Sequence, residues 1–88
     1  MLTAEQEARA KMPAYEAELA DAEVAARFEE LLAEALKTGP GRPGACGNSP
    51  FWTFDTAGAE ICVSRIVSRA QDDVSRARWI AAQARKAA

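Results

Sequence analysis

Large apolar side chains are scarce in this chain of 88 residues, although 49% of its residues are hydrophobic. Much of that fraction is alanine, whose burial removes little apolar area from water. A chain of this length buries only about 60–65% of the surface that it exposes when unfolded, so its stability is marginal. We therefore expect every bulky residue to lie in one small core, within a single domain over residues 1–88.

The longest apolar stripe lies between residues 14 and 36 and is typical of one amphipathic helix. Its members recur every three or four residues: Ala17, Ala20, Val24, Phe28, Leu31, Leu32, Ala35 and Leu36. Thr3 and Gln6 match a capping box, which predicts an earlier helix start. Pro13 lacks the amide donor that a helix interior needs, so it predicts a bend or a new helix start.

The segment GPGRPGACGNSP, residues 39–50, separates this acidic, helical half (residues 1–38) from the rest of the chain. Gly39 can adopt the left-handed capping conformation, and Pro40 prevents the helix from continuing. The density of glycine and proline predicts a loop. Residues 39–44 also match G-x-G-x-x-G, but they follow a helix and contain two prolines, which argues against a dinucleotide site.

The sequence FWTFDTAGAEICVSR predicts an antiparallel hairpin over residues 51–66. Residues 51–55 and 60–66 are its expected strands, and the sequence DTAG between them matches a type I turn with a following bulge. A lone two-stranded hairpin is marginal in water, so one of its faces must pack on helices. The rings that would supply the packing area belong to Phe51, Trp52 and Phe54.

A closing helix is predicted over residues 68–87. Ser68 and Gln71 match a second capping box. The apolar residues that follow step by four and three: Ala70, Val74, Ala77, Ala81, Ala84 and Ala88. The same stepping extends back to Val67 and Val63, so a single long helix that begins near Ala59 is the alternative. The expected fold is α+β, in the order helix, hairpin, helix.

Charge is distributed unevenly, although the net charge is only -2. Residues 1–37 carry nine acidic and four basic side chains, whereas residues 38–88 carry four acidic and seven basic ones. Such a split can present an acidic face to a basic partner or simply form solvated helix faces. The acidic residues that we expect to meet a basic groove of a partner protein lie off the apolar stripe: Glu16, Glu23, Glu30 and Glu34. A second face with small residues could receive a helix from the same chain or from a second copy, which would form a homodimer.

The residue types argue against catalysis and metal binding. Histidine, the commonest general base and metal ligand, does not occur. Cys46 and Cys62 are too few and too isolated for a zinc site. We expect no cofactor and no enzymatic activity. The start of the chain is acidic and no apolar run approaches about 20 residues, so we expect a cytoplasmic protein with no membrane segment. In that compartment we expect the two cysteines to stay reduced unless the fold brings them together.

Arginines beside an aromatic ring can contact phosphates or a nucleotide base. Arg76, Arg78 and Trp79 are therefore an alternative site for a nucleotide that the protein would sequester, or for nucleic acid. Two aspartates on the same helix and an isoelectric point of 5.1 argue against direct nucleic-acid binding. Trp79 lies off the alanine stripe and either bridges the helix and the hairpin or belongs to a partner surface.

The segments WTFDTAGAEIC (residues 52–62) and ARWIAA (residues 77–82) resemble small accessory proteins encoded by bacteriophages and prophages. In those proteins a strand and a DxxGxxIC turn and strand precede a helix that carries ARLIAA. Trp79 stands where leucine is commoner, and the leucine-rich helix lies at the front of this chain. The resemblance implies a non-enzymatic protein that binds and inhibits a host protein, such as a CRISPR effector in a nucleic-acid-binding defence complex. A structural or assembly factor is a further alternative.

Overall fold

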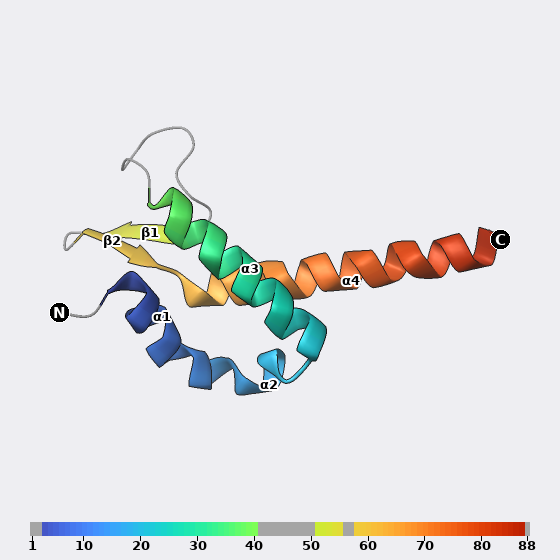
Figure 1. Ribbon diagram of the computed structural model, residues 1–88, viewed down its shortest axis with the longest axis horizontal. Coiled ribbons are helices and arrows are strands. Elements are labelled where there is room, and N and C mark those ends of the chain that lie inside the picture. Colours follow the sequence, from blue (N-terminus) through green and yellow to red (C-terminus); the bar gives the residue numbers. More distant parts are fainter. Residues whose placement is uncertain (1–2, 41–50, 56–57, 88) are drawn as a thin grey trace.

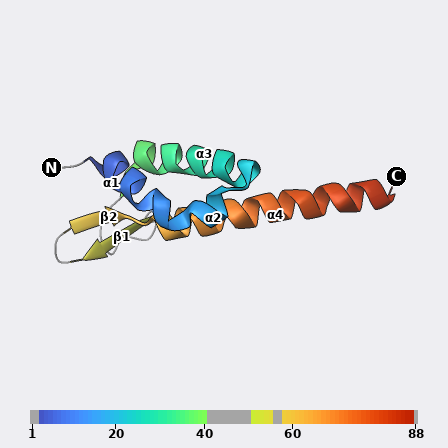
Figure 2. The same ribbon diagram turned by 90° about the horizontal axis from the view of Figure 1, so that it is seen from below.

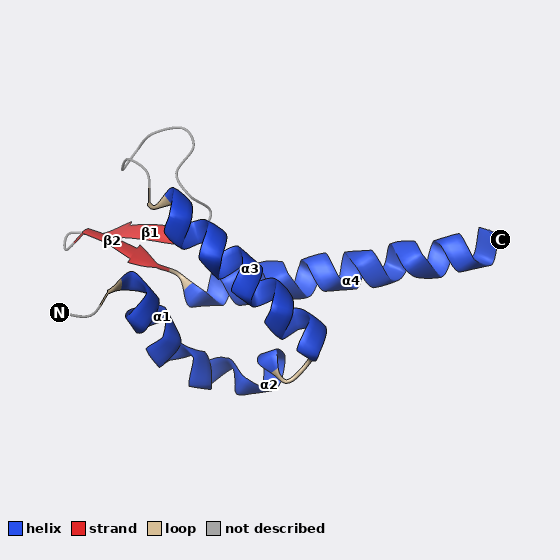
Figure 3. Cartoon of the chain, in the orientation of Figure 1, coloured by secondary structure: helices blue, strands red, loops and turns tan. Residues whose placement is uncertain are grey.

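The computed structural model describes residues 3–40, 51–55 and 58–87. Its elements are, in order, α1 (Ala4–Lys11), the 3-10 turn η1 (Met12–Tyr15), α2 (Glu16–Leu19), α3 (Ala22–Thr38), β1 (Trp52–Asp55), β2 (Gly58–Ile61) and α4 (Val63–Ala87). Figure 1 shows α3 crossing the first half of α4, with the hairpin at one end of the molecule. The predicted order of helix, hairpin and helix is confirmed (Figure 3).

The first helix begins as the capping box predicts. The Thr3 side-chain oxygen accepts a hydrogen bond from the Gln6 amide at 3.1 Å, and the Gln6 side chain accepts one from the Thr3 amide at 2.8 Å. Pro13 then occupies the first turn of η1, where its missing donor costs nothing. The predicted bend at Pro13 is confirmed.

The single helix predicted over residues 14–36 is wrong, because the backbone breaks at Ala20 and Asp21. Asp21 is extended, and its carboxylate accepts the Glu23 amide at 3.0 Å, so it caps a new helix, α3. Ala17 and Ala20 precede the break and are exposed. The end of α3 is as predicted, since Gly39 has a φ of 73° and donates its amide to Ala35 at 2.9 Å.

The hairpin is shorter than the sequence predicts. β1 and β2 are antiparallel, with Trp52 opposite Ile61, and the Cys62 amide adds a hydrogen bond of 2.7 Å to the Phe51 carbonyl. Residues 63–66, predicted as strand, are helical. Residues 41–50, which include Cys46, lie outside the described part of the chain. So do the two turn residues 56 and 57 and the side chain of Phe54.

The closing helix α4 begins at Val63, five residues before the predicted start at Ser68. Ser68 therefore lies inside the helix and is no cap. The alternative start near Ala59 is also wrong, because Ala59 belongs to β2. The residues that α4 buries follow helical spacing from its first position onward: Val63, Ile66, Val67, Ala70 and Val74.

The core lies where α3 crosses the first half of α4. Its largest fully buried side chains are Phe28, Leu32, Ile61 and Ile66. The hairpin closes one side of this core, since Trp52 is 8% exposed and its indole N–H donates to the Ala35 carbonyl at 3.1 Å. Trp52 therefore supplies core area, as predicted, and Phe51 packs against the core while half-buried.

Ion pairs join the elements around this core. Arg9 of α1 pairs with Glu29 of α3, Lys11 pairs with Glu60 of β2, and Arg27 of α3 donates to Asp73 of α4 at 2.9 Å. The Arg9 guanidinium lowers the pKa of Glu29 through its hydrogen bonds. Most of these groups are more than a third exposed, so each pair contributes only about 0–1 kcal/mol. Apolar packing therefore dominates the stability.

Two isoleucines on α4 provide a matched test of this core. Ile66 is 0% exposed and Ile80 is 55% exposed. We expect Ile66→Val to lower the free energy of unfolding by about 0.5–1.5 kcal/mol, because it removes a buried methylene. Ile80→Val changes helix propensity in the same way but should leave the free energy almost unchanged. Urea denaturation of dilute protein measures both, and equal losses would contradict the packing described.

Candidate functional site

The second half of α4 extends beyond the other helices, as the two views in Figures 1 and 2 show. Val74 is its last buried residue, and every later position up to Ala87 is exposed except Ala82, which is half-buried. The 25 residues of α4 span about 38 Å. The radius of gyration, 15.2 Å, accordingly exceeds the value of about 12 Å expected for a compact chain of this length.

This projecting half has an unusual composition for an exposed helix. Residues 74–87 contain no acidic side chain and four basic ones, Arg76, Arg78, Arg85 and Lys86. Trp79 is 64% exposed and Ile80 is 55% exposed, and they are the exposed large hydrophobic residues of the described chain. Exposed apolar side chains amid polar ones are typical of surfaces that bind another molecule.

Trp79 and the alanine stripe occupy opposite sides of the helix. At about 100° per residue, Trp79 points away from the side that carries Ala77, Ala81 and Ala84. The residues that share its side, at spacings of three, four and seven, are Arg76, Gln83 and Lys86. We call these four residues the Trp79 face. Trp79 does not join the core, so the interpretation that it bridges helix and hairpin is wrong.

The predicted site of Arg76, Arg78 and Trp79 does not come together as one pocket. Arg78 reaches back to the start of α3, where it donates to both carboxylate oxygens of Asp21 at 2.8 and 3.1 Å. It also lies 3.4 Å from a Glu23 carboxylate oxygen. The Arg78 hydrogen bonds hold the pKa of Asp21 below its usual value. Arg76, two residues away, points to the other side of the helix.

The predicted acidic residues lie on two helices. Glu16 belongs to α2, and Glu23, Glu30 and Glu34 follow an exposed side of α3. Glu23 pairs with Arg78, and Glu30 pairs with Arg27 at 2.8 Å. Glu16 and Glu34 form no ion pair with another described residue. Half of this acidic face is thus compensated within the chain, and its role as a partner surface stays a prediction.

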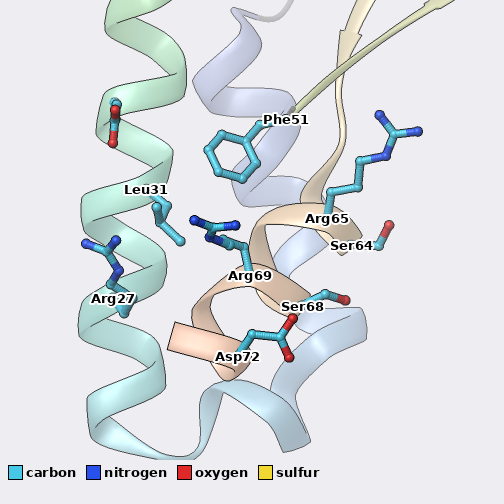
Figure 4. A pocket seen from close by; sticks show the side chains of 9 residues that line it. Arg27, Leu31, Phe51, Ser64, Arg65, Ser68, Arg69 and Asp72 are labelled. Atoms are coloured by element: carbon cyan, nitrogen blue, oxygen red, sulfur yellow. The ribbon is translucent and has the colours of Figure 1, made fainter. Parts of the chain in front are cut away.

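A cleft of about 600 Å³ lies between α3 and the first turns of α4 (Figure 4). Figure 4 shows Arg69 extending from α4 between Leu31 and Phe51. Arg69 lies 3.2 Å from the Asp73 carboxylate, which also accepts a hydrogen bond from Arg27. The remaining lining residues are Glu34, Ser64, Arg65, Ser68 and Asp72. Because the lining carries both signs of charge and two of its guanidinium groups already share a carboxylate, the cleft has no marked preference for anions.

Cys62 immediately precedes α4, and it is half-buried and free. Its sulfur lies 3.3 Å from the Ser64 hydroxyl oxygen. Burial raises the pKa of the Cys62 thiol. Hydrogen bonds from the Ser64 side chain and from the backbone amides of Arg65 and Ser64, together with the Arg65 charge, lower the pKa by more than burial raises it. The net pKa is therefore below its ordinary value. The thiolate is therefore favoured by the start of the helix.

The lowered pKa of Cys62 predicts its pattern of alkylation. In a Cys46→Ser variant, the rate of reaction with iodoacetamide should rise with a midpoint at lower pH in the folded protein than in urea, because the thiolate is the reacting form. Cys46→Ser is needed so that only Cys62 is measured. A midpoint in the folded protein at or above that of the unfolded chain would contradict the stabilised thiolate.

Among residues 3–40, 51–55 and 58–87, no three histidine, cysteine, aspartate or glutamate side chains are grouped so that they could hold a metal ion. Within the same ranges, no helix combines the length and the apolar character needed to cross a lipid bilayer.

Comparisons with protein-family models, curated proteins and solved structures gave no match. The exposed side chains of the described residues are therefore the features that point to a candidate binding site.

Proposed function

We propose that this protein is a non-enzymatic binding protein that engages a partner protein through the Trp79 face of α4. One observation carries the proposal: a tryptophan with 64% exposure stands among basic residues on a helix that extends away from the core. Tryptophan and arginine are the residues that most often dominate the energy of protein interfaces. The chain has few large apolar residues and only two tryptophans, so leaving Trp79 exposed forgoes the stability that its burial in the core would provide.

The chemistry of the face defines the partner. A preformed helix that presents an indole suits an apolar groove, because the helix is already ordered and binding requires little further loss of conformational entropy. Arg76 and Lys86 flank Trp79, so the rim of that groove should be acidic. Complementary charge of this kind mainly raises the association rate and fixes the orientation of the helix.

The resemblance to bacteriophage accessory proteins suggests the class of partner. Some of those proteins bind a host protein and block its activity, and a CRISPR effector is one such host protein. On this proposal the Trp79 face is the anchor. Glu16 and Glu34, which have no ion-pair partner among the described residues, would add contacts to basic positions of the host protein.

Substitution of Trp79 tests the proposal. Wild-type protein would be used to capture partners from a bacterial lysate, and the dissociation constant of each captured protein would then be measured with purified components. We expect Trp79→Ala to weaken binding by at least about tenfold, because it removes the anchor. Arg76→Glu with Lys86→Glu should slow association and make it less sensitive to salt.

Gln71→Ala is the matched control, because Gln71 is exposed but lies in the half of α4 that packs against the core. This substitution should leave binding unchanged. Circular dichroism checks that each variant stays folded. Undiminished capture by Trp79→Ala would contradict the proposal. A nucleotide that raises the melting temperature of the wild type but not of Trp79→Ala would favour the nucleotide-sequestering alternative instead.

A further inference from the structure

Two hollows between α3 and α4 form one furrow. The cleft of about 600 Å³ lies beside the first turns of α4, and a second hollow of about 520 Å³ lies beside its middle. The residues of α3 that line them recur every three or four positions, so they share one side of that helix: Glu23, Arg27, Glu30 and Glu34. The lining residues of α4 do the same: Arg65, Arg69, Asp72, Arg76 and Ile80. The furrow therefore runs along about 24 Å of α4.

Apolar side chains line both ends of the furrow. Leu31 and the half-buried Phe51 line the cleft. Ala26, Ala77 and Ile80 line the second hollow, and Ile80 is 55% exposed. Each end can therefore receive an apolar side chain of a bound molecule.

Many of the charged groups in the furrow are already paired within the chain. The pairs are Glu23 with Arg78, Glu30 with Arg27, and Asp73 with both Arg27 and Arg69. Four exposed lining groups form no ion pair with a described residue: Glu34, Arg65, Asp72 and Arg76. These four are available to a bound molecule without the loss of a contact inside the chain.

Along α4 the available groups are basic, acidic and basic in turn. Asp72 follows Arg65 by seven residues and Arg76 follows Asp72 by four, so the three share one side of the helix over about 16 Å. A second helix has the same rise per residue. When it lies alongside α4, an acidic, a basic and an acidic side chain with the same spacing meet all three groups. Glu34, on the α3 side of the furrow, favours a further basic side chain.

A different flank of the α3–α4 pair shows which kind of segment fills such a space. There η1 and α2 lie against α4, and α2 also lies against α3. Tyr15 and Leu19 pack against the core, and the ion pairs of Arg9 and Lys11 hold the edge of the N-terminal segment. No described residue of α1, η1 or α2 lines either hollow of the furrow. The chain itself thus covers one flank with a helical segment that has an apolar side and a charged edge.

We propose that the furrow binds an amphipathic helix of the partner protein, over about sixteen residues of that helix. Two acidic side chains of the helix, eleven residues apart, meet Arg65 and Arg76. A basic side chain between them meets Asp72. Apolar residues of the same helix pack on Phe51 at one end of the furrow and on Ile80 at the other.

A synthetic helix tests the furrow without a captured partner. The probe is an alanine-based peptide of about eighteen residues with a leucine stripe. Beside the stripe it carries glutamate, lysine and glutamate, spaced by seven and four residues. A second probe has the two spacings in the opposite order, because the helix can lie in either direction. The control peptide exchanges glutamate and lysine. The net charge of the protein, -2, favours the control, so overall charge cannot produce a preference for the probe.

NMR titration of the whole chain measures the binding. We expect one of the two probes to bind with a dissociation constant below about 1 mM and to shift the amides of Ala26, Leu31 and Ile80 most. The control peptide should bind at least about tenfold more weakly, because it places like charges beside Arg65 and Arg76. Saturation by neither probe, or equal binding of probe and control, would overturn the proposal.

Charge reversal in the protein tests the register. Arg65→Glu should weaken binding of the probe by at least about tenfold, because it places a carboxylate beside a glutamate of the probe. Arg85→Glu is the matched control, since Arg85 is exposed, forms no ion pair with a described residue and lies on the opposite side of α4. It should leave the affinity nearly unchanged. Equal effects of the two substitutions would also overturn the proposal.

This inference rests on the proposed function, because the helix belongs to the same partner protein, and the captured partner separates the two claims. Trp79→Ala should weaken binding of the partner but not of the probe, since Trp79 lines neither hollow. Arg65→Glu should weaken binding of both. A partner that depends on Trp79 and not on Arg65 would overturn the furrow and leave the proposed function standing. A partner that depends on Arg65 and not on Trp79 would contradict the proposed function instead.

Discussion

The packing of α3 against the first half of α4 is the contact on which the rest of the structure depends. Phe28 and Leu32 from α3 and Ile66 from α4 are at most 1% exposed, and the other helices and the hairpin are arranged around them. A chain whose apolar residues are so often alanine has few bulky side chains with which to build another such contact. The second half of α4 is therefore left uncovered.

The hairpin serves the same core. Trp52 fills the space beside Ala35 and satisfies that carbonyl through its indole N–H, and Ile61 enters the core from the paired strand. The strand ends there because the next apolar residues, Val63, Ile66 and Val67, recur with helical spacing and can all face α3 only in a helix. An early start of α4 thus extends the buried stripe by one turn.

Much of this fold could be predicted from local signals. Local backbone geometry determines three of these features: the capping box of Thr3 with Gln6, the bend at Pro13 and the helix end at Gly39. The sequence around each is therefore sufficient to predict its role. The break at Asp21 could not be predicted in the same way, because the three- and four-residue spacing of small residues passes through it unchanged. The predicted start of α4 at Ser68 is wrong because Ser68 and Gln71 satisfy a capping pattern inside a helix, where the pattern has no orphan amides to cap.

The candidate site is only partly predictable from the sequence. Trp79 and Arg76 are close in the sequence, which is sufficient to predict them as neighbours, and both are exposed. The partner of Arg78 could not be foreseen, because Asp21 lies 57 positions away and meets it only through the crossing of the two helices. Ile80 is not among the predicted site residues, although its separation of fourteen residues from Ile66 places it on the same side of the helix.

The claim that only the first half of α4 is held by the core is tested most directly by amide hydrogen exchange in dilute solution. Amides between residues 67 and 74 should exchange only with global unfolding, whereas those between residues 79 and 86 should exchange at least about a hundredfold faster through local opening. Equal protection along the whole of α4 would contradict the account, because it would mean that the projecting half is as firmly held as the core.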